Sequence, residues 1–330
     1  MRHPAVNWIP WGRDKCACRV QNRSQECYKP MNSFSHPSRG QSQAAAQPDF
    51  RRQVEAWRQL LIQCGQKPSR KAVHSLRVAT LRLQAGVEYW LRAQEPDAPA
   101  ARAAKRWNKQ GKKLRRALNP VREADVSLAR LASLRASTAG PPEGQLPCSR
   151  GCLRQIGELE QKLTETRQAA AKKLIDVIED RRKRMERLST EMEAALAMSP
   201  WGCAGKDLLA MFASLREEFP ELEAETLHTY RKRLKKVRYL AEISAVGDAL
   251  AARQAAILKR MQSAAGEWHD WQALASQAGR AFRGNGSTSA LTQLLEARAQ
   301  EFLKEALGQC RRATAQLLGR DALNHSSSPR

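Results

Sequence analysis

The sequence predicts an all-α fold built from two similar helical bundles. From residue 48 onward, apolar residues recur at spacings of three and four, which is the period of amphipathic helices. No segment shows the strict alternation of apolar and polar residues that indicates a half-buried strand. The order of the predicted helices then repeats along the chain. This internal duplication predicts two pseudo-symmetric halves, each ending in a long helix.

The first half is expected at residues 48–197. A Pro- and Gly-rich stretch, PPEG, interrupts the helical pattern and predicts a linker within this half at 138–151. A long amphipathic helix at about 153–197 follows the linker. The shorter helices before it are predicted at 48–64, 70–93, 99–118 and 122–137.

The second half is expected at residues 203–318. Its helices are predicted at 206–219, 222–246, 248–265, 267–281 and 288–318. The two ends of the chain lack helical periodicity. Residues 1–47 are rich in Ser, Pro, Asn and Gln and predict a disordered arm, and residues 319–330 predict a disordered tail.

The charge balance points to an anionic partner. The chain carries 57 Lys and Arg against 33 Asp and Glu, a formal net charge of +24. Such an excess suits nucleic acid, polyphosphate or an acidic membrane surface. Only 5% of the residues are aromatic, which argues against base-stacking platforms. No apolar run of about 18 residues exists, so no membrane insertion is expected, and the eight cysteines are interpreted as reduced thiols.

The stretch LHTYRKRLKKVRYL, residues 227–240, concentrates this charge. It holds one histidine, six lysines and arginines, and no acid. On a helix its apolar residues form one stripe: Leu227, Tyr230, Leu234, Val237 and Ala241. The adjoining surface carries cations about one turn apart, roughly 5.4 Å along the axis, a spacing that suits a chain of phosphates. A solvated surface helix is the alternative interpretation, but no acid between 226 and 241 supplies the usual i,i+4 pairing.

A related helix is predicted in the first half. The stretch AVHSLRVATLRLQAGVEYW at 72–90 aligns with TLHTYRKRLKKVRYLAEIS at 226–244, so that His74 matches His228, Arg77 matches Arg231 and Glu88 matches Glu242. Recurrence of the His-x-x-Arg pair favours a site over a solvated surface. A histidine among cations is expected to stay neutral and to gain a proton beside a bound phosphate.

These two stretches resemble the CHAD domain family (conserved histidine α-helical domain). The family pattern reads roughly V-H-x-L-R-V-x-x-R-R-L-R, and the first half keeps His74, Leu76, Arg77, Val78 and Arg82. Leu81 and Gln84 stand where the family commonly has basic residues. The second half is the better match, with His228, Arg231, Lys235, Lys236, Arg238 and Tyr239 in place. The resemblance covers about residues 48–318.

Membership of this family implies two all-helical halves and binding of inorganic polyphosphate in a basic central groove or pore. KKLRRALNPVREADVSLARL at 112–131 and ILKRMQSAAGEWHDWQAL at 257–274 resemble a helix that follows the motif in many members. Asp125 and Asp270 match acids that orient a basic neighbour or cap a helix. The predicted polyphosphate-binding residues are His74, Arg77, Arg82, Lys112, Lys113, Arg115, Arg116, Arg122, His228, Arg231, Lys232, Lys235, Lys236, Arg238, Lys259 and Arg260.

We therefore expect a non-catalytic polyphosphate-binding protein of the cytoplasm. Recruitment to polyphosphate granules is a further hypothesis. The alternative is a nucleic-acid-binding protein that uses the same basic surface, and under the first hypothesis nucleic acid would be a weaker competitor. The sequence indicates no oligomeric state.

Catalysis, a cofactor and a metal site are not expected. Glu158, Glu160 and Lys162 match an E-x-E-x-K motif of triphosphate tunnel enzymes, but that motif needs alternate strand positions and here lies in a helical run. His269 and Asp270 resemble an acid–base pair but no nucleophile is recognisable near them, and Trp268 and Trp271 are interpreted as core. Among the cysteines, the spacings of Cys16, Cys18 and Cys27 fit no common zinc site.

Overall fold

The computed structural model describes residues 50–94, 98–138, 149–197, 203–283 and 289–319. All regular structure in these ranges is helical, which confirms the all-α prediction. The elements are α1 (Phe50–Gln66), α2 (Arg70–Trp90), the 3₁₀ turn η1 (Leu91–Ala93), α3 (Pro99–Thr138), α4 (Arg150–Ala197), α5 (Gly205–Glu218), α6 (Ala224–Ser244), α7 (Ala249–Ala281) and α8 (Ala290–Leu318). The predicted arm at 1–47, linker residues 139–148, tail residues 320–330 and the cysteines of the zinc hypothesis lie outside the described residues.

The helix α3 is continuous where the sequence predicted two helices. Pro120 lies inside it, although proline has no N–H to donate to the carbonyl one turn earlier and usually ends or kinks a helix. The flanking Leu118 and Val121 are both fully buried. Because residues before and after Pro120 pack into the core, tertiary contacts compensate for the hydrogen bond that proline cannot make, and the helix stays continuous.

The helix α7 likewise joins two predicted helices, with Gly266 in its interior. An interior glycine costs a helix only about 1 kcal/mol relative to alanine. The flanking Ala265 and Trp268 are buried, so packing again outweighs the local preference. In the described ranges, each half therefore has two shorter α-helices followed by two longer ones, and not three or four shorter helices and one long one.

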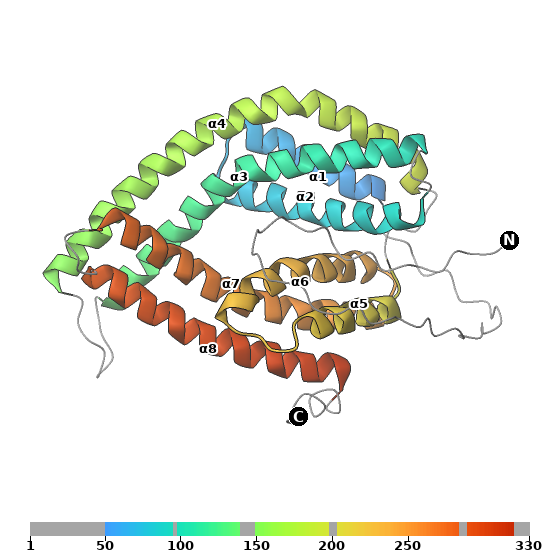
Figure 1. Ribbon diagram of the computed structural model, residues 1–330. Helices are drawn as coiled ribbons and strands as arrows, with labels where there is room; N and C mark the ends of the chain where they lie inside the picture. The colour runs from blue at the N-terminus through green and yellow to red at the C-terminus, as the bar shows by residue number, and fades with distance from the viewer. Residues whose placement is uncertain (1–49, 95–97, 139–148, 198–202, 284–288, 320–330) are drawn as a thin grey trace, which may run out of the picture. The chain divides into compact units, whose positions relative to one another are not determined.

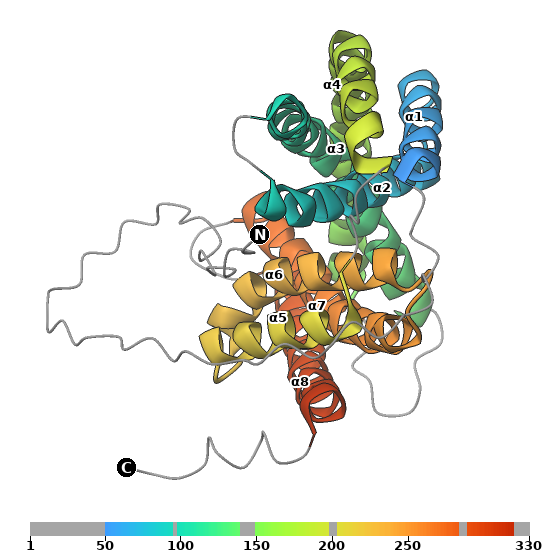
Figure 2. The same cartoon turned by 90° about the vertical axis from the view of Figure 1, so that its right-hand side faces the viewer.

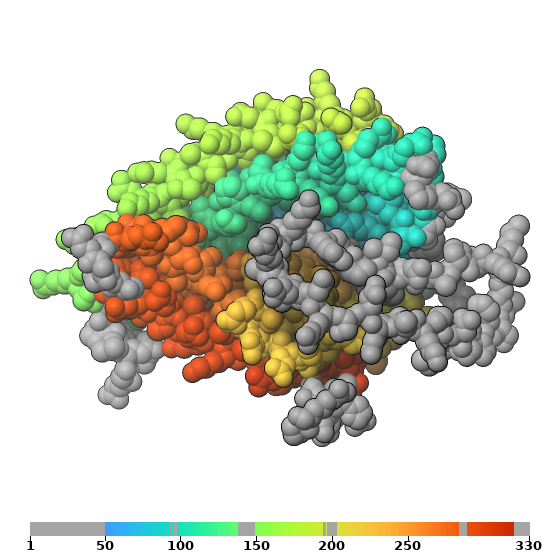
Figure 3. Space-filling model, viewed as in Figure 1, coloured from blue at the N-terminus to red at the C-terminus, as the bar shows by residue number. Residues whose placement is uncertain are grey.

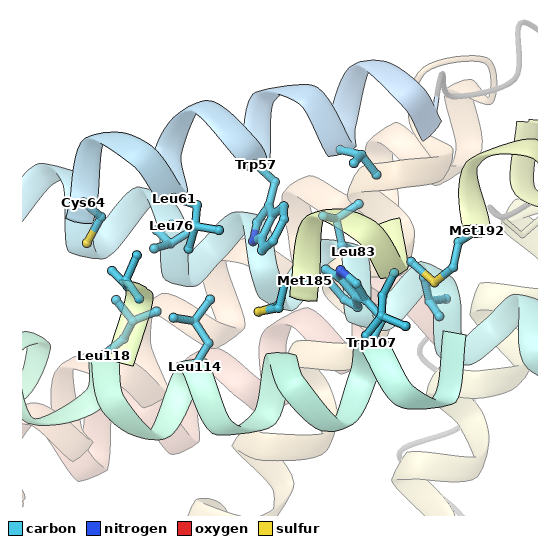
Figure 4. Packing of buried hydrophobic residues seen from close by; sticks show 14 of the residues in the cluster. Trp57, Leu61, Cys64, Leu76, Leu83, Trp107, Leu114, Leu118, Met185 and Met192 are labelled. Atoms are coloured by element: carbon cyan, nitrogen blue, oxygen red, sulfur yellow. The ribbon is translucent and has the colours of Figure 1, made fainter. Parts of the chain in front are cut away.

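The first four helices pack around one apolar core (Figure 4). The Trp57 and Trp107 rings meet edge to face at its centre, with their centroids 5.6 Å apart. Each indole N–H finds a partner in the interior: Trp57 Nε1 donates to Thr80 Oγ1 at 3.0 Å and Trp107 Nε1 to Ser189 Oγ at 2.9 Å. These contacts tie α1 to α2 and α3 to α4, and so fix the helices that carry the first His-x-x-Arg motif.

The helices α5–α8 repeat the order of α1–α4, as an internal duplication predicts. In Figures 1 and 2, α2 lies beside α6, and α3 also contacts α7. All the described helices belong to one compact unit, residues 44–330. The two helices with His-x-x-Arg motifs thus face each other across the boundary between the halves.

The two halves also share an apolar core where α3, α4, α7 and α8 converge. In the space-filling view, atoms of α4 and α7 adjoin there (Figure 3). Its fully buried members are Leu131, Ile156, Leu274, Ala278, Leu291 and Leu295. The halves are therefore held together by hydrophobic burial as well as by polar contacts.

Three further predictions from the sequence can be compared with the structure. Glu158, Glu160 and Lys162 lie on α4, so their side chains cannot alternate as on a strand. None of the described helices is long and apolar enough to cross a membrane. The interpretation of the cysteines as reduced thiols holds for the three free ones, Cys64, Cys203 and Cys310, and is wrong for Cys152, which is disulfide-bonded.

Candidate functional site

The helix α6 presents its cations because its apolar stripe is fully used for packing. All five predicted stripe residues are buried: Leu227, Tyr230, Leu234, Val237 and Ala241. The helix starts in a capping box in which the Glu223 backbone N–H donates to Thr226 Oγ1 at 2.9 Å. Arg233, which the helical projection placed apart from the other cations, pairs with Glu218 at 2.6 Å. Two of the remaining cations, Arg231 and Lys235, interact electrostatically with residues of α2, α3 and α7.

Four cations from three helices form what we call the basic cluster: Arg77 of α2, Arg122 of α3, and Arg231 and Lys235 of α6. Arg231 and Lys235 each interact electrostatically with both Arg77 and Arg122, so the cluster joins the two halves. The Arg122 guanidinium lies 3.3 Å from the Asp270 carboxylate of α7. Arg77 Nε donates to Asn119 Oδ1 at 3.1 Å. The two helices with His-x-x-Arg motifs thus contribute cations to the same cluster.

Burial and mutual repulsion act together on the basic cluster. Burial lowers the pKa of Arg231 to about 10; Asp270 opposes the shift, and Arg122 and Arg77 add to it. Burial, followed by repulsion from Arg231, Arg77 and Arg122, holds the pKa of Lys235 well below its usual range. Lowered pKa values mean that positive charge is unfavourable here in the absence of an anion. A bound anion would relieve that cost.

Three histidines border the basic cluster. The His228 and His269 rings lie 4.8 Å apart, one from α6 and one from α7. Burial, then Arg231 and His228, lower the pKa of His269 to about 3. Burial and the neighbouring Lys232 and Arg231 also lower the pKa of His228. His74 on α2 is more exposed, and partial burial with Arg122 and Arg77 lowers its pKa as well. Neutral histidines are thus favoured, as expected beside cations.

Two equivalent ion pairs link α2 and α6 next to the basic cluster. Arg82 of α2 lies 2.8 Å from Glu242 of α6, and Lys236 of α6 lies 3.2 Å from Glu88 of α2. The internal repeat relates Arg82 to Lys236 and Glu88 to Glu242. Arg238 also pairs with Glu242. These three predicted site cations are therefore partly neutralised, although α6 contains no acid between 226 and 241: Glu88 of α2 pairs with Lys236, and Glu242, just after that stretch of α6, pairs with Arg82 and with Arg238.

Among the other predicted site residues, Arg115 of α3 interacts electrostatically with Arg77 of the basic cluster. Lys112 and Arg115 of α3 interact electrostatically with Lys236, and Arg116 with Arg115, so they extend the positive charge past the Glu88 ion pair. Lys113 and Lys232 are exposed on α3 and α6.

The two predicted binding residues on α7, Lys259 and Arg260, have different surroundings. Lys259 lines a pocket of about 390 Å³ together with Arg82 and Glu242, next to one of the α2–α6 ion pairs. Arg260 instead donates to Gln316 Oε1 of α8 at 3.1 Å. The structure therefore directs Arg260 toward α8 and does not bring it to the basic cluster.

The surroundings of Gln84 explain why a glutamine can stand where the family commonly has a basic residue. It is 4% exposed, and its Nε2 donates to the Asn108 carbonyl of α3 at 3.0 Å. Its amide passes so close to α3 that a Cβ on Gly111 would lie 2.9 Å from Nε2. Position 84 thus packs between α2 and α3, and the glutamine removes no cation from the basic cluster. Arg77 and Arg122 are the cations that the first half contributes to the cluster, and Arg115 interacts electrostatically with Arg77.

The two acids implied by the family resemblance each orient a basic neighbour. Asp125 accepts from Arg167 Nε of α4 at 2.8 Å, and Asp270 pairs with Arg122 across the halves. Trp268 and Trp271 are buried, as predicted for core residues. The contact of His269 with His228 was missed, because nothing in the sequence indicates that the two histidines meet. The α2–α6 ion pairs were missed too: the repeat relates Arg82 to Lys236 and Glu88 to Glu242, but it does not show that the two helices pack against each other.

Comparisons with known proteins agree with this architecture. The family model for the CHAD domain matches residues 45–279. PptA from Streptomyces chartreusis has a similar structure, with a TM-score of 0.59 and 16% identity, over 83% of this chain and 97% of that one. The CHAD domain from the plant Ricinus communis has a TM-score of 0.52 and 18% identity, over 88% and 96%. No curated protein sequence matches. The family match spans well over half of the chain, and the chain therefore belongs to the CHAD domain family.

Proposed function

We propose that this protein binds inorganic polyphosphate without catalysis, through the basic cluster and the cations that border it. The observation that carries the proposal is the meeting of Arg77 and Arg122 with Arg231 and Lys235 across the two halves. In the part of the chain that the structure describes, no carboxylate lies within ion-pair distance of Arg77, Arg231 or Lys235. Such crowding is unfavourable without a ligand, so it points to an anion.

The chemistry of the cluster suits a condensed phosphate chain. Arginine grips phosphate oxygens in pairs with its planar fork of donors, and lysine adds a compact charge. A chain with about one negative charge per phosphate contacts cations of both halves at once, and the displaced counterions favour binding. The further cations Lys112, Arg115 and Arg116 give a longer chain additional contacts.

The buried aromatic residues of α6 and α7 argue against single-stranded nucleic acid as the main ligand. Trp268, Trp271 and Tyr230 are at most 5% exposed, so their rings are not available to stack on bases. The Tyr239 ring is buried too, with the Arg238 guanidinium 4.2 Å from its centroid. Recognition therefore rests on charge, and a polyanion without bases fits it best. Within this proposal the protein acts in the cytoplasm and is recruited to polyphosphate granules.

A competition experiment tests the identity of the ligand. Labelled long-chain polyphosphate is bound to the full chain at physiological salt and displaced with unlabelled polyphosphate, tRNA, duplex DNA or heparin, compared per negative charge. We expect polyphosphate to compete at least tenfold better than either nucleic acid, a difference of about 1.4 kcal/mol. Equal competition by tRNA or DNA would support the nucleic-acid alternative and reject the polyphosphate proposal.

A further inference from the structure

The pair of histidines beside the basic cluster has an unusual environment. His228 and His269 face each other at 4.8 Å with their ring planes inclined by 49°. His269 Nδ1 is buried and, within the described residues, has no hydrogen-bond partner. The nearest acid in the sequence, Asp270, is engaged with Arg122. A polar atom of this pair is thus left unsatisfied at the edge of a site built for an anion.

Cations of α6 and α3 surround this pair. From α6, Arg231 and Lys235 act on both rings, and Lys232 acts on His228. From α3, Arg122 acts on His269. On α7 itself, the neighbours are Asp270, already paired, and Trp268, whose ring centroid lies 6.4 Å from that of His269. Burial and these cations lower both histidine pKa values, so without a ligand both rings are neutral near pH 7.

A polyanion at the basic cluster reverses this balance. A negative charge within about 4–6 Å favours the protonated form of an imidazole. The phosphates also offset Arg231, Lys235 and Arg122, which oppose protonation of His269 in the free protein. We propose that His269 belongs to the anion-binding site and that the His228–His269 pair takes up a proton when polyphosphate binds, so that binding strengthens as the pH falls. This inference rests on the proposed function.

The sign and size of the effect follow from linkage. The histidine pKa is lower in the free protein than in the complex, so the complex holds more protons between the two values. Affinity therefore rises as the pH falls through that window, by up to tenfold per pH unit for each proton. Two imidazoles in contact repel each other when both are charged, so we expect about one proton for the pair.

Calorimetry of the full chain tests the proposal directly. Long-chain polyphosphate is titrated into the protein at pH 7 in buffers of different ionisation enthalpy, which reports the protons taken up on binding. The dissociation constant is then measured at pH 6, 7 and 8. Long chains keep the share of terminal phosphates small, because those groups titrate near pH 6. We expect about one proton taken up by the wild type and a several-fold tighter dissociation constant for each pH unit lowered.

The decisive comparison uses the double variant His228→Gln/His269→Gln. Glutamine keeps a hydrogen-bond donor but does not titrate. In the double variant, therefore, the only proton uptake and pH dependence that should remain are those due to Lys235. The single variant His228→Gln leaves α7 unchanged and serves if the double variant unfolds; it should lose part of the uptake. Lys172→Gln, which removes an exposed cation of α4, should keep the full pH dependence.

The outcomes separate the two proposals. If the wild type binds polyphosphate with no proton uptake, or if the double variant keeps the full uptake, the histidine proposal is wrong and the polyphosphate proposal stands. If the wild type does not bind polyphosphate at any of the three pH values, the proposed function itself fails.

Discussion

Two adjoining regions join the halves of this protein, and their chemistry is opposite. Where α3, α4, α7 and α8 converge, the halves share an apolar core with six fully buried aliphatic residues. Next to it, α2 and α3 face α6 and α7 across the basic cluster. Burial of apolar surface stabilises the first contact, whereas repulsion among partly desolvated cations opposes the second. The apolar core thus allows the halves to hold cations close together before any ligand is present.

The largest effect is expected from a cavity in the shared core. Leu295 of α8 is fully buried there, and Leu295→Ala should lower the free energy of unfolding by about 2–5 kcal/mol. Urea unfolding followed by circular dichroism measures the loss. Polyphosphate affinity of the folded variant should match the wild type, and a comparable loss of affinity would show that the two regions are not separable.

The pH dependence of stability should come from the charged region. The pKa values of His228 and His269 are lowered in the folded protein, so the unfolded chain binds more protons below the ordinary histidine value near 6.5. Stability without ligand should therefore fall as the pH is lowered from 7 to 5, by up to about 1.4 kcal/mol per pH unit for each group.

His269→Gln should flatten this dependence in thermal unfolding at pH 5, 6 and 7. An unchanged slope in the variant would mean that other groups cause the acid destabilisation. Stability without ligand therefore falls as the pH falls, whereas ligand affinity rises. Both trends have the same cause, because the cations disfavour protonated histidines in the free protein and the ligand offsets these cations.

Removing one buried cation should stabilise the free protein. Lys235 is repelled by Arg231, Arg77 and Arg122, so Lys235→Met should raise the free energy of unfolding by about 1 kcal/mol. The same change should weaken polyphosphate binding. Thermal unfolding with and without polyphosphate measures both effects, and a lower melting temperature of the ligand-free variant would contradict the idea that charge crowding is unfavourable.

The smallest effect is expected from the α2–α6 ion pairs. Their cations, Arg82 and Lys236, are about two-fifths exposed, so each pair contributes only about 0–1 kcal/mol. Glu88→Gln with Glu242→Gln should cost little stability and should tighten polyphosphate binding, because the cations lose their competing carboxylates. Fluorescence anisotropy with labelled polyphosphate measures this gain. Weaker binding would instead assign the two acids a role in holding the site together.

The fold was predictable to the extent that it depends on local pattern. The period of the apolar residues placed Leu227, Tyr230 and Leu234 on the buried side of α6, and the structure confirms this. The same reasoning failed at Pro120 and Gly266, because local preferences there are overruled by buried neighbours that only the folded chain brings together.

The sequence predicted many residues of the candidate site but not which of them contact each other. The internal repeat identified both His-x-x-Arg helices, and it was enough to relate Glu88 to Glu242. It did not show that Glu88 would meet Lys236, because a helical pattern reveals which side of a helix is buried but not which helix covers it. The contact of His228 with His269 depends on how α6 crosses α7, and this crossing is set by the packing of the whole second half.

The central claim is that polyphosphate lies on the basic cluster, and the salt dependence of binding tests it most directly. Arg231→Gln/Lys235→Gln is compared with Lys172→Gln/Lys173→Gln, which removes the same charge from exposed positions on α4. The logarithm of the binding constant is plotted against the logarithm of the salt concentration for both variants and the wild type. Neutralising the cluster should weaken binding and lower the magnitude of the slope by about 1–2, whereas the α4 variant should keep the wild-type slope. Equal changes in the two variants would contradict the claim and would indicate non-specific attraction to the net charge.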